Sequence, residues 1–358
     1  MAQTNRLRRH LFKIPFFLCI VCVVYLLFQS KDFKAKYQTR SDQYTVFNST
    51  VFNASSVIES YKFHWSNSSQ SIEIVMLFTH VQDHIRMKDK LIICLSSLFE
   101  HTTTPLHILL ITDDSSLPIA RDVLLEVTAK YSNKLQVDFY HVDNVVDPLH
   151  EMVSYMQPHF TYKEGAYYSD ALFFLSIGIH RVFPHKKLIM MDIDIKFLSD
   201  VKELHSHFKK FGSNAVIGIA QEQQPVYRHL LHIYRRKNPS TRIGSPSPKG
   251  MQGFNSGVLL LNLERMRRSR LYNGVINAET VERLTKKYSF KGHLGDQDFF
   301  SLISFEYEEL FYVLPCTWNR QLCQWWKYHG YESVFDAYYK CKGKINIYHG
   351  NCNAYLPD

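Results

Sequence analysis

Two aspartates separated by one residue, Asp192 and Asp194, follow an apolar run at residues 188–191. In an extended backbone, side chains two residues apart point to the same face, so both carboxylates can share one cation. Carboxylate oxygens suit hard divalent cations, and such a cation can neutralise the charge of a leaving diphosphate. The same pattern also suits a turn at the end of a strand. The pair therefore indicates a candidate metal site that needs support from other residues.

A glycine-containing segment at residues 252–258 leads into an apolar stretch. Asn255 and Ser256 can form hydrogen bonds with a ligand, and Gly257 allows the backbone to approach it closely. A plain glycine-rich turn is the alternative. We expect this segment to contact the same ligand as the aspartates.

A second acidic cluster, Asp296-Gln297-Asp298, precedes further apolar residues, and its alternative interpretation is a helix N-terminus capped by Asp296. Gln297 carries an amide, which is a poor nucleophile. Near the C-terminus, His349 follows an alternating stretch at residues 344–347. A neutral imidazole there can serve as a third metal ligand, although a single histidine is more often structural.

Four of the seven cysteines crowd the C-terminal region, at positions 316, 323, 341 and 352. In an oxidising compartment they would form two disulfides, with three connectivities open. A zinc site is disfavoured because the spacings lack the short gap of a zinc knuckle. Cys94 lies in an apolar run and is expected to be a buried free thiol.

Trp318, Trp325 and Trp326 lie among these cysteines. Two adjacent aromatic side chains cannot both face one side of a strand, so one of them could be exposed and stack on a sugar or on an acceptor protein. Packing of all three within a disulfide-bonded region is the alternative.

The elements that must position these residues alternate between strand and helix patterns. Alternation of this kind predicts a parallel sheet covered on both faces, with ligands at the carboxyl ends of the strands, where Asp192 and Asp194 lie. We expect an irregular loop at residues 221–250 and no internal repeat. The expected strands are 72–78, 106–112, 135–142, 187–191 and 254–263, and the expected helices run to residue 98 and over 117–131 and 165–181.

The N-terminus carries a membrane signal. Arg6, Arg8 and Arg9 precede an apolar segment of about 18 residues, which as a helix would extend about 27 Å. Positive charge before the segment keeps the N-terminus cytosolic. A cleaved signal peptide is the alternative, but residues 28–31 lack a small-residue cleavage site. We therefore expect a cytosolic tail at residues 1–10 and a transmembrane signal anchor at 11–29.

Three glycosylation sequons, at Asn48, Asn53 and Asn67, cluster after the apolar segment. Together with the cysteines they favour a lumenal, glycosylated stem at residues 30–70, followed by a catalytic domain at residues 71–358. The net charge of +9 could also suit nucleic acid or an acidic membrane surface, but the two basic runs, near residues 235–237 and 265–270, are short. We therefore expect no nucleic-acid partner.

The order of these motifs resembles that of glycosyltransferase family 8, whose members are retaining enzymes of the GT-A fold. The resemblance covers most of the chain from about residue 72. The fold it implies is α/β, a Rossmann-like mixed sheet with helices on both faces, here joined to a transmembrane helix and a disulfide-bonded C-terminal segment. The motifs that carry the resemblance are the D-x-D after a strand, FNSGVLLLNL, LGDQD and the strand ending in His-Gly.

The resemblance implies a role for each matching residue. Manganese, with magnesium as the alternative, would be held by Asp192, Asp194 and His349. Asp296 would bind the donor sugar, and Gln297 would lie beside the anomeric carbon. The resemblance also implies donor contacts from Asn255 and Gly257, and disulfides pairing Cys316 with Cys341 and Cys323 with Cys352. By residue type alone, Ser256 is a further candidate for a donor contact, Asn351 is one candidate for the phosphate contact beside backbone amides or a basic residue elsewhere, and Trp325 and Trp326 are candidates for acceptor contacts.

Within the family, the segments CTWNRQLCQWW and IYHGNCN resemble type II membrane enzymes of the endoplasmic reticulum or Golgi. Those enzymes transfer xylose from UDP-xylose, in α-1,3 linkage, onto xylose-glucose on EGF-like repeats such as those of Notch. The implied partners are thus a UDP-sugar and an EGF-repeat glycoprotein, and a homodimer is left open. The chain departs from the family in one respect, because no lysine for the diphosphate follows His349.

Because the amide of Gln297 is a poor nucleophile, we hypothesise front-face transfer. In this mechanism the departing diphosphate accepts the proton of the acceptor hydroxyl, and the anomeric configuration is retained. A covalent route through Asp296 or Asp298 is the competing mechanism. UDP-glucose or UDP-galactose remains open as the donor. A catalytically silent glycan-binding protein of the same fold is the alternative function.

Overall fold

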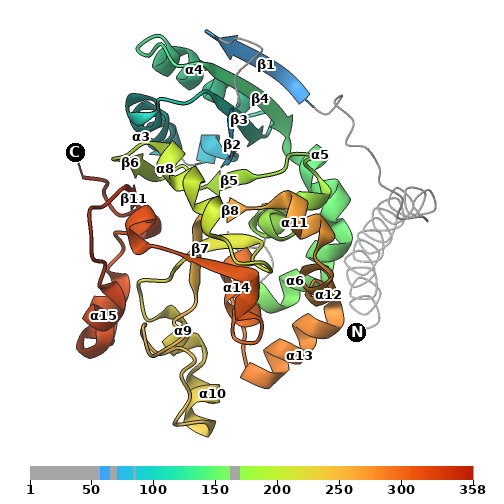
Figure 1. Cartoon of the computed structure of the whole chain (residues 1–358), viewed down its shortest axis with the longest axis vertical. Helices are drawn as coiled ribbons and strands as arrows, with labels where there is room; N and C mark the ends of the chain where they lie inside the picture. The colour runs from blue at the N-terminus through green and yellow to red at the C-terminus, as the bar shows by residue number, and fades with distance from the viewer. Residues whose placement is uncertain (1–56, 65–70, 84–85, 162–169, 358) are drawn as a thin grey trace, which may run out of the picture. The chain divides into compact units, whose positions relative to one another are not determined.

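The computed structural model describes residues 57–64, 71–83, 86–161 and 170–357, all within one compact unit that spans residues 52–358 (Figure 1). Its centre is an eight-stranded mixed sheet in the order β1-β4-β3-β2-β5-β8-β7-β9. Strands β4, β3, β2 and β5 run parallel, whereas β8 is antiparallel to both of its neighbours. The strands are β1 Val57–Phe63, β2 Ile72–Phe78, β3 Leu106–Thr112, β4 Leu135–His141, β5 Leu188–Met191, β7 Ile217–Gln221, β8 Phe254–Leu261 and β9 Phe311–Leu314.

Both faces of this sheet are buried, so inner strands such as β2 and β5 are mostly apolar along their length rather than only at alternate residues. In β2, Ile74 and Met76 pack with one group of helices, while Val75 packs with the other. The first group is α3 Arg86–His101, α4 Leu117–Thr128 and α8 Val201–Ser206. The second group includes α5 Val142–Val146, α6 His150–Phe160, α7 Leu175–Gly178, α11 Leu263–Arg268, α12 Arg270–Val275, α13 Ala278–Tyr288 and α14 Asp296–Ser304.

A small second sheet, in the order β10-β11-β6, lies at the end of β5 (Figure 1). Its strands are β10 Arg320–Gln321, β11 Ile347–His349 and β6 Ile195–Phe197. Because β11 pairs antiparallel with β6, His349 lies opposite Ile195, the residue after the second aspartate. The small sheet therefore brings the C-terminal histidine to the D-x-D turn across about 150 residues of sequence.

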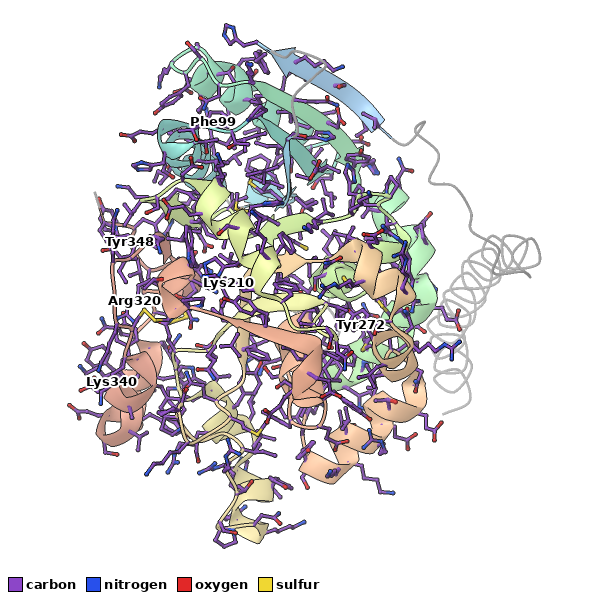
Figure 2. All side chains as sticks on the ribbon, in the orientation of Figure 1. Phe99, Lys210, Tyr272, Arg320, Lys340 and Tyr348 are labelled. Atoms are coloured by element: carbon purple, nitrogen blue, oxygen red, sulfur yellow. A yellow bond between two sulfur atoms is a disulfide. The ribbon has the colours of Figure 1, made fainter. Side chains whose placement is uncertain are left out.

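The C-terminal region is joined by the two disulfides that the family resemblance implies, Cys316–Cys341 and Cys323–Cys352. Between them lies Arg320, which is labelled in Figure 2. It stacks on the ring of Tyr339 at 3.8 Å and donates hydrogen bonds to Gln223 Oε1 and to the Tyr339 carbonyl oxygen. Tyr339 ends α15 Glu332–Tyr339, so this contact ties α15 to β10. Cys94 is a buried free thiol, as expected.

The strands expected at residues 72–78 and 106–112 are confirmed, but three expectations were wrong. The sheet is mixed, as the family resemblance implied, and not wholly parallel. The expected loop at 221–250 contains α9 Val226–Leu230 and α10 His232–Lys237. The described part of the expected helix at 165–181 forms three short turns, Ala171–Phe174, Leu175–Gly178 and Ile179–Arg181, in place of one continuous helix. Asp170 caps the first turn, and Gly178 ends the second.

Strand β1 lies inside the range expected to be a stem, residues 30–70, and forms one edge of the large sheet by pairing antiparallel with β4. Its residues alternate between half-buried and exposed, so they lack the apolar run that marks the inner strands. The expected tail, anchor and sequons, residues 1–29 and Asn48, Asn53 and Asn67, lie outside the described residues. Among the described helices, none has the length and apolar character needed to cross a membrane.

Candidate active site

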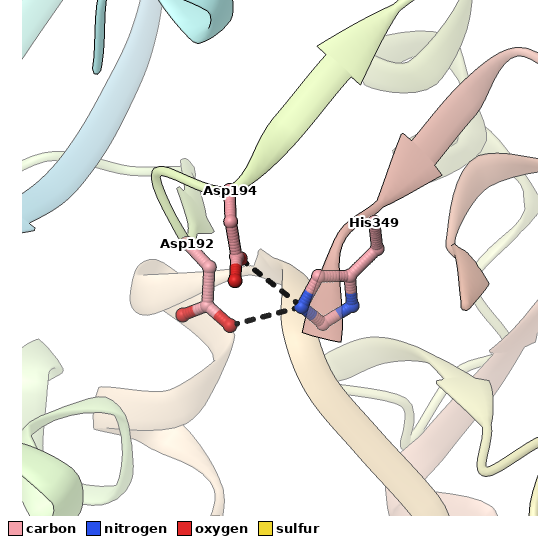
Figure 3. Close-up of side chains that lie close together, drawn as sticks. All are labelled: Asp192, Asp194 and His349. Atoms are coloured by element: carbon pink, nitrogen blue, oxygen red, sulfur yellow. Dashed lines mark ion pairs between the residues drawn. The ribbon is translucent and has the colours of Figure 1, made fainter. Parts of the chain in front are cut away.

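The turn between β5 and β6 and the end of β11 bring Asp192, Asp194 and His349 together (Figure 3). His349 Nε2 lies 3.3 Å from Asp192 Oδ2 and 3.3 Å from Asp194 Oδ1. One ligand atom from each residue can be chosen so that all three lie within 4.8 Å of one another. His349 is buried, whereas the Asp192 side chain is 59% exposed, so the cluster opens to solvent on one side.

The donor set fits a hard divalent cation. Asp194 Oδ1 is buried and, apart from its ion pair with His349 Nε2, has no hydrogen-bond partner among the described residues. Asn319 Oδ1 lies 2.9 Å from His349 Nδ1 and accepts its proton, which leaves Nε2 to face the two carboxylates. A side chain at Gly257 would collide with the imidazole, since its Cβ would lie 2.2 Å from His349 Cε1. Glycine is therefore required beneath this histidine for steric reasons.

The negative charges of Asp192 and Asp194 have the largest net effect on the pKa of His349. Burial alone would lower the pKa of His349, but Asp192 and Asp194 raise it to about 10. Burial likewise opposes ionisation of Asp194, yet His349 and Lys90 lower its pKa to about 2. Without a metal, the two carboxylates therefore favour the protonated form of His349.

Asp296, the first residue of α14, is buried and accepts hydrogen bonds from two serines. Ser256 Oγ donates to Oδ1 at 2.9 Å, and Ser176 Oγ donates to Oδ2. Burial raises the pKa of Asp296 to about 7 despite these donors. The helix N-terminus that the sequence suggested is thus real, but its cap is Gly295 and the carboxylate packs against β8.

Gln297 has a fixed orientation because both protons of its amide have acceptors inside the protein. Nε2 lies 3.4 Å from Glu222 Oε2 and 3.3 Å from the Tyr227 hydroxyl. Tyr227 donates its own proton to Asp298 Oδ1 at 3.0 Å, so its oxygen is left to accept. The carbonyl oxygen of Gln297 then lies on the opposite side, 3.4 Å from Ser256 N.

A buried chain of amides connects Gln297 with the metal cluster. Asn319 Nδ2 donates to Asn255 Oδ1 at 2.9 Å, and Asn255 Nδ2 donates to Glu222 Oε2 at 3.2 Å. The side chain of Asn255 therefore bonds to other protein groups. Through Asn319 it is linked to His349, and through Glu222 it is linked to Gln297. Asn351 Oδ1 is also engaged, since it accepts the backbone N–H groups of residues 322 and 323 at 3.0 Å.

The three tryptophans have different environments. Trp325 is 50% exposed and stacks on His329 with ring centroids 3.7 Å apart. Trp326 is half-buried against His229, at 4.9 Å, whereas Trp318 is buried. Trp325 and Trp326 lie on a single helical turn, η10 Trp325–Tyr328, and not on a strand. The sequence argument from strand geometry was therefore wrong, but one member of the pair is exposed.

Sequence reasoning missed Lys90, Glu222, Tyr227 and Asn319. Lys90 Nζ lies 3.3 Å from Asp194 Oδ2 and 2.9 Å from Asn353 Oδ1. A local signal exists only for Asn319, which lies in the CTWNRQLC segment that carries the family resemblance. The others become visible only when helices α3 and α9 and the end of β7 are placed in space.

Comparison with known proteins agrees with this arrangement. Residues 44–336 match the family described as Glycosyl transferase family 8. The chain belongs to glycosyltransferase family 8. The chain is 45% identical, over 294 residues, to xyloside xylosyltransferase 1 of Mus musculus and of Homo sapiens, covering 80% of this chain and 74% of each relative. A more distant relative in the family is human xylosyl- and glucuronyltransferase LARGE1, 29% identical over 63% of this chain and 27% of the relative.

The crystal structure of mouse xyloside xylosyltransferase 1 in its apo form superimposes with a TM-score of 0.77 at 44% identity. The match covers 80% of this chain and all of the mouse chain in that structure. The mixed sheet with helices on both faces is therefore the GT-A-like fold of the family.

Proposed function

We propose that this chain is a metal-dependent, retaining xylosyltransferase that moves xylose from UDP-xylose onto a xylose-terminated glycan in α-1,3 linkage. The cluster of Asp192, Asp194 and His349 carries the proposal, because buried hydrogen bonds link this candidate cation site to a neutral amide, Gln297, that cannot act as a strong nucleophile. The 45% identity to xyloside xylosyltransferase 1 supports xylose as the sugar.

When bound, the cation would stabilise the negative charge that develops on the leaving UDP. The proposed role of Asp296 is to bind the donor sugar, since two serines hold its carboxylate at the start of α14. The Gln297 carbonyl oxygen would then stabilise positive charge at the anomeric carbon. The C1–O bond to UDP breaks on the same face on which the acceptor oxygen binds, and UDP takes the hydroxyl proton, so the configuration is retained.

We assign acceptor binding to the aromatic surface around Trp325 and Trp326. An exposed tryptophan stacked on His329 offers a flat apolar face of the kind on which sugars pack. The proposed acceptor is a xylose-glucose glycan on an EGF-like repeat. Trp326 supports this surface through its contacts with His229 and Tyr331.

The direct test offers the full-length chain UDP-xylose, UDP-glucose and UDP-galactose, with and without Mn²⁺ or Mg²⁺, and measures UDP release. We expect metal-dependent release that is fastest with UDP-xylose. The alternative of a catalytically silent protein predicts no release from any donor. Fastest release with UDP-glucose would keep the family assignment and reject xylose.

A second experiment tests the acceptor surface. Replacing Trp325 with Ala should raise the acceptor KM about tenfold, while hydrolysis of UDP-xylose without acceptor stays unchanged. Replacing Tyr355, which is 78% exposed, with Ala is the matched control for loss of a surface aromatic. Equal acceptor KM in both variants would contradict the role of Trp325.

We further propose that residues 11–29 anchor the chain in the membrane of the endoplasmic reticulum or Golgi, with the catalytic domain in the lumen. The apolar segment and the two disulfides support this placement. Removal of N-glycans should increase the electrophoretic mobility of the wild type, and less so when Asn48, Asn53 and Asn67 are replaced with Gln. No shift in the wild type would argue against a lumenal body.

A further inference from the structure

We infer that Lys90 is the residue that contacts the diphosphate of the nucleotide-sugar, an inference that rests on the proposed function of the site. Lys90 lies in the second turn of α3, and its side chain is 23% exposed. Its ammonium group lies between Asp194 Oδ2, at 3.3 Å, and Asn353 Oδ1, at 2.9 Å. It therefore borders the metal cluster from an element that carries none of the cluster's ligands.

The charges of the groups at the site show why a positively charged side chain is needed at the position of Lys90. A divalent cation held by two carboxylates and a neutral imidazole gives a cluster with no net charge. A diphosphate carries at least two negative charges, so a neutral cluster by itself offers it little long-range attraction. The ammonium group of Lys90 contacts Asp194 Oδ2, the carboxylate oxygen that does not face His349. It therefore supplies a positive charge at the border of the candidate metal site.

The chain beyond His349 does not supply this charge. Residues 350–358 contain no lysine or arginine, and Asn351 Oδ1 already accepts two backbone N–H groups. Instead, the turn there brings Asn353 to Lys90 through two consecutive left-handed residues, Cys352 and Asn353, each with φ of 57°. Such conformations are unfavourable for residues other than glycine and concentrate at functional sites. Cys352 is fixed there by its disulfide with Cys323.

A purely positioning role is the competing explanation, since Lys90 could only orient Asp194 toward the metal. The two roles predict different effects of a substitution at Lys90 on the affinities for UDP, uridine and the metal. A phosphate contact affects UDP but not uridine, whereas a positioning role affects the metal even without nucleotide. The discriminating measurement is therefore equilibrium binding of Mn²⁺ alone, and then of UDP and of uridine to the Mn²⁺-loaded protein.

We expect Lys90→Met to weaken UDP binding about ten- to hundredfold, the usual effect of losing a charge-assisted hydrogen bond. Uridine and Mn²⁺ affinities should change less than about threefold, and Lys90→Arg should retain most of the UDP affinity. Lys88→Met is the matched control, because Lys88 is exposed on the same helix. It should leave all three affinities unchanged.

Three outcomes would overturn the assignment. They are unchanged UDP affinity in Lys90→Met, equal weakening of UDP and uridine, and a loss of Mn²⁺ affinity that accounts for the whole loss of UDP affinity. Thermal unfolding of each variant establishes that the protein is folded. Because the readout is binding, failure to transfer xylose would contradict the proposed function without affecting the assignment of Lys90.

Discussion

At the scale of single residues, the site depends on which way one amide points. An amide can present either its NH₂ group or its oxygen to a ligand, and only the oxygen stabilises positive charge. Glu222 and the Tyr227 hydroxyl accept both protons of Gln297, which turns the carbonyl oxygen to the opposite side. The orientation is therefore set by these two buried side chains together with the backbone N–H of Ser256, which donates to the Gln297 carbonyl oxygen at 3.4 Å.

Replacing Tyr227 with Phe should lower kcat about five- to thirtyfold with little change in donor KM, because one Gln297 proton loses its acceptor and the amide is then held only by Glu222 and the backbone N–H of Ser256. Steady-state kinetics with varied donor would measure this. The control is Tyr338→Phe, which removes a comparably buried hydrogen bond, to the Gly244 carbonyl oxygen. The same loss of kcat in both variants would indicate general destabilisation instead.

At the scale of elements, the site exists because two sheets meet at the end of β5. Strand β8 passes beneath His349, and β11 holds the histidine opposite the D-x-D turn. The contact is so close that Gly257 has no room for a side chain. Metal binding should therefore be sensitive to a substitution in β8, which carries no metal ligand.

Gly257→Ala should weaken Mn²⁺ binding at least about tenfold, because the new methyl group must displace the imidazole of His349. Gly274→Ala is the control, since a Cβ there would meet nothing within 4 Å. Titration calorimetry with Mn²⁺ would compare the two variants. Wild-type Mn²⁺ affinity in Gly257→Ala would mean that the histidine is not a ligand.

At the scale of the whole molecule, the burial of an acidic side chain at the site makes the stability of the folded protein depend on pH. Glu222 lies in the core, where burial raises its pKa from 4.5 to about 7 despite donors such as Asn255. An acid with a raised pKa in the folded state favours folding while it is protonated. Its stabilising contribution is complete below about pH 4.5 and is lost as the pH rises toward 7.

The free energy of unfolding of the wild type, relative to Glu222→Gln, should therefore fall by about 3 kcal/mol between about pH 4.5 and pH 7 and then stay level. Urea denaturation in the presence of a chelator would measure both proteins across this range. A difference that does not vary with pH would show that Glu222 is ionised throughout.

Much of the fold could be predicted because its signals are local. Strands β2 and β3 are apolar runs whose ends are evident in the sequence, and Asp192 and Asp194 directly follow such a run. The third candidate ligand, His349, could be proposed because it also ends a strand. Strand β1 was missed because its alternating, half-buried residues resemble a polar segment.

The motifs in the sequence were enough to recognise the family, the three residues of the candidate metal site and, through the family resemblance, the pairing of the cysteines. Which other polar groups contact these residues became evident only from the packing of the helices and strands. Lys90 and Asn353 are 263 residues apart, and Glu222 and Gln297 are 75 apart. A lysine or glutamate in such a position looks like any surface residue in the sequence, because its role depends on contacts that form only when α3, β7 and α14 pack together.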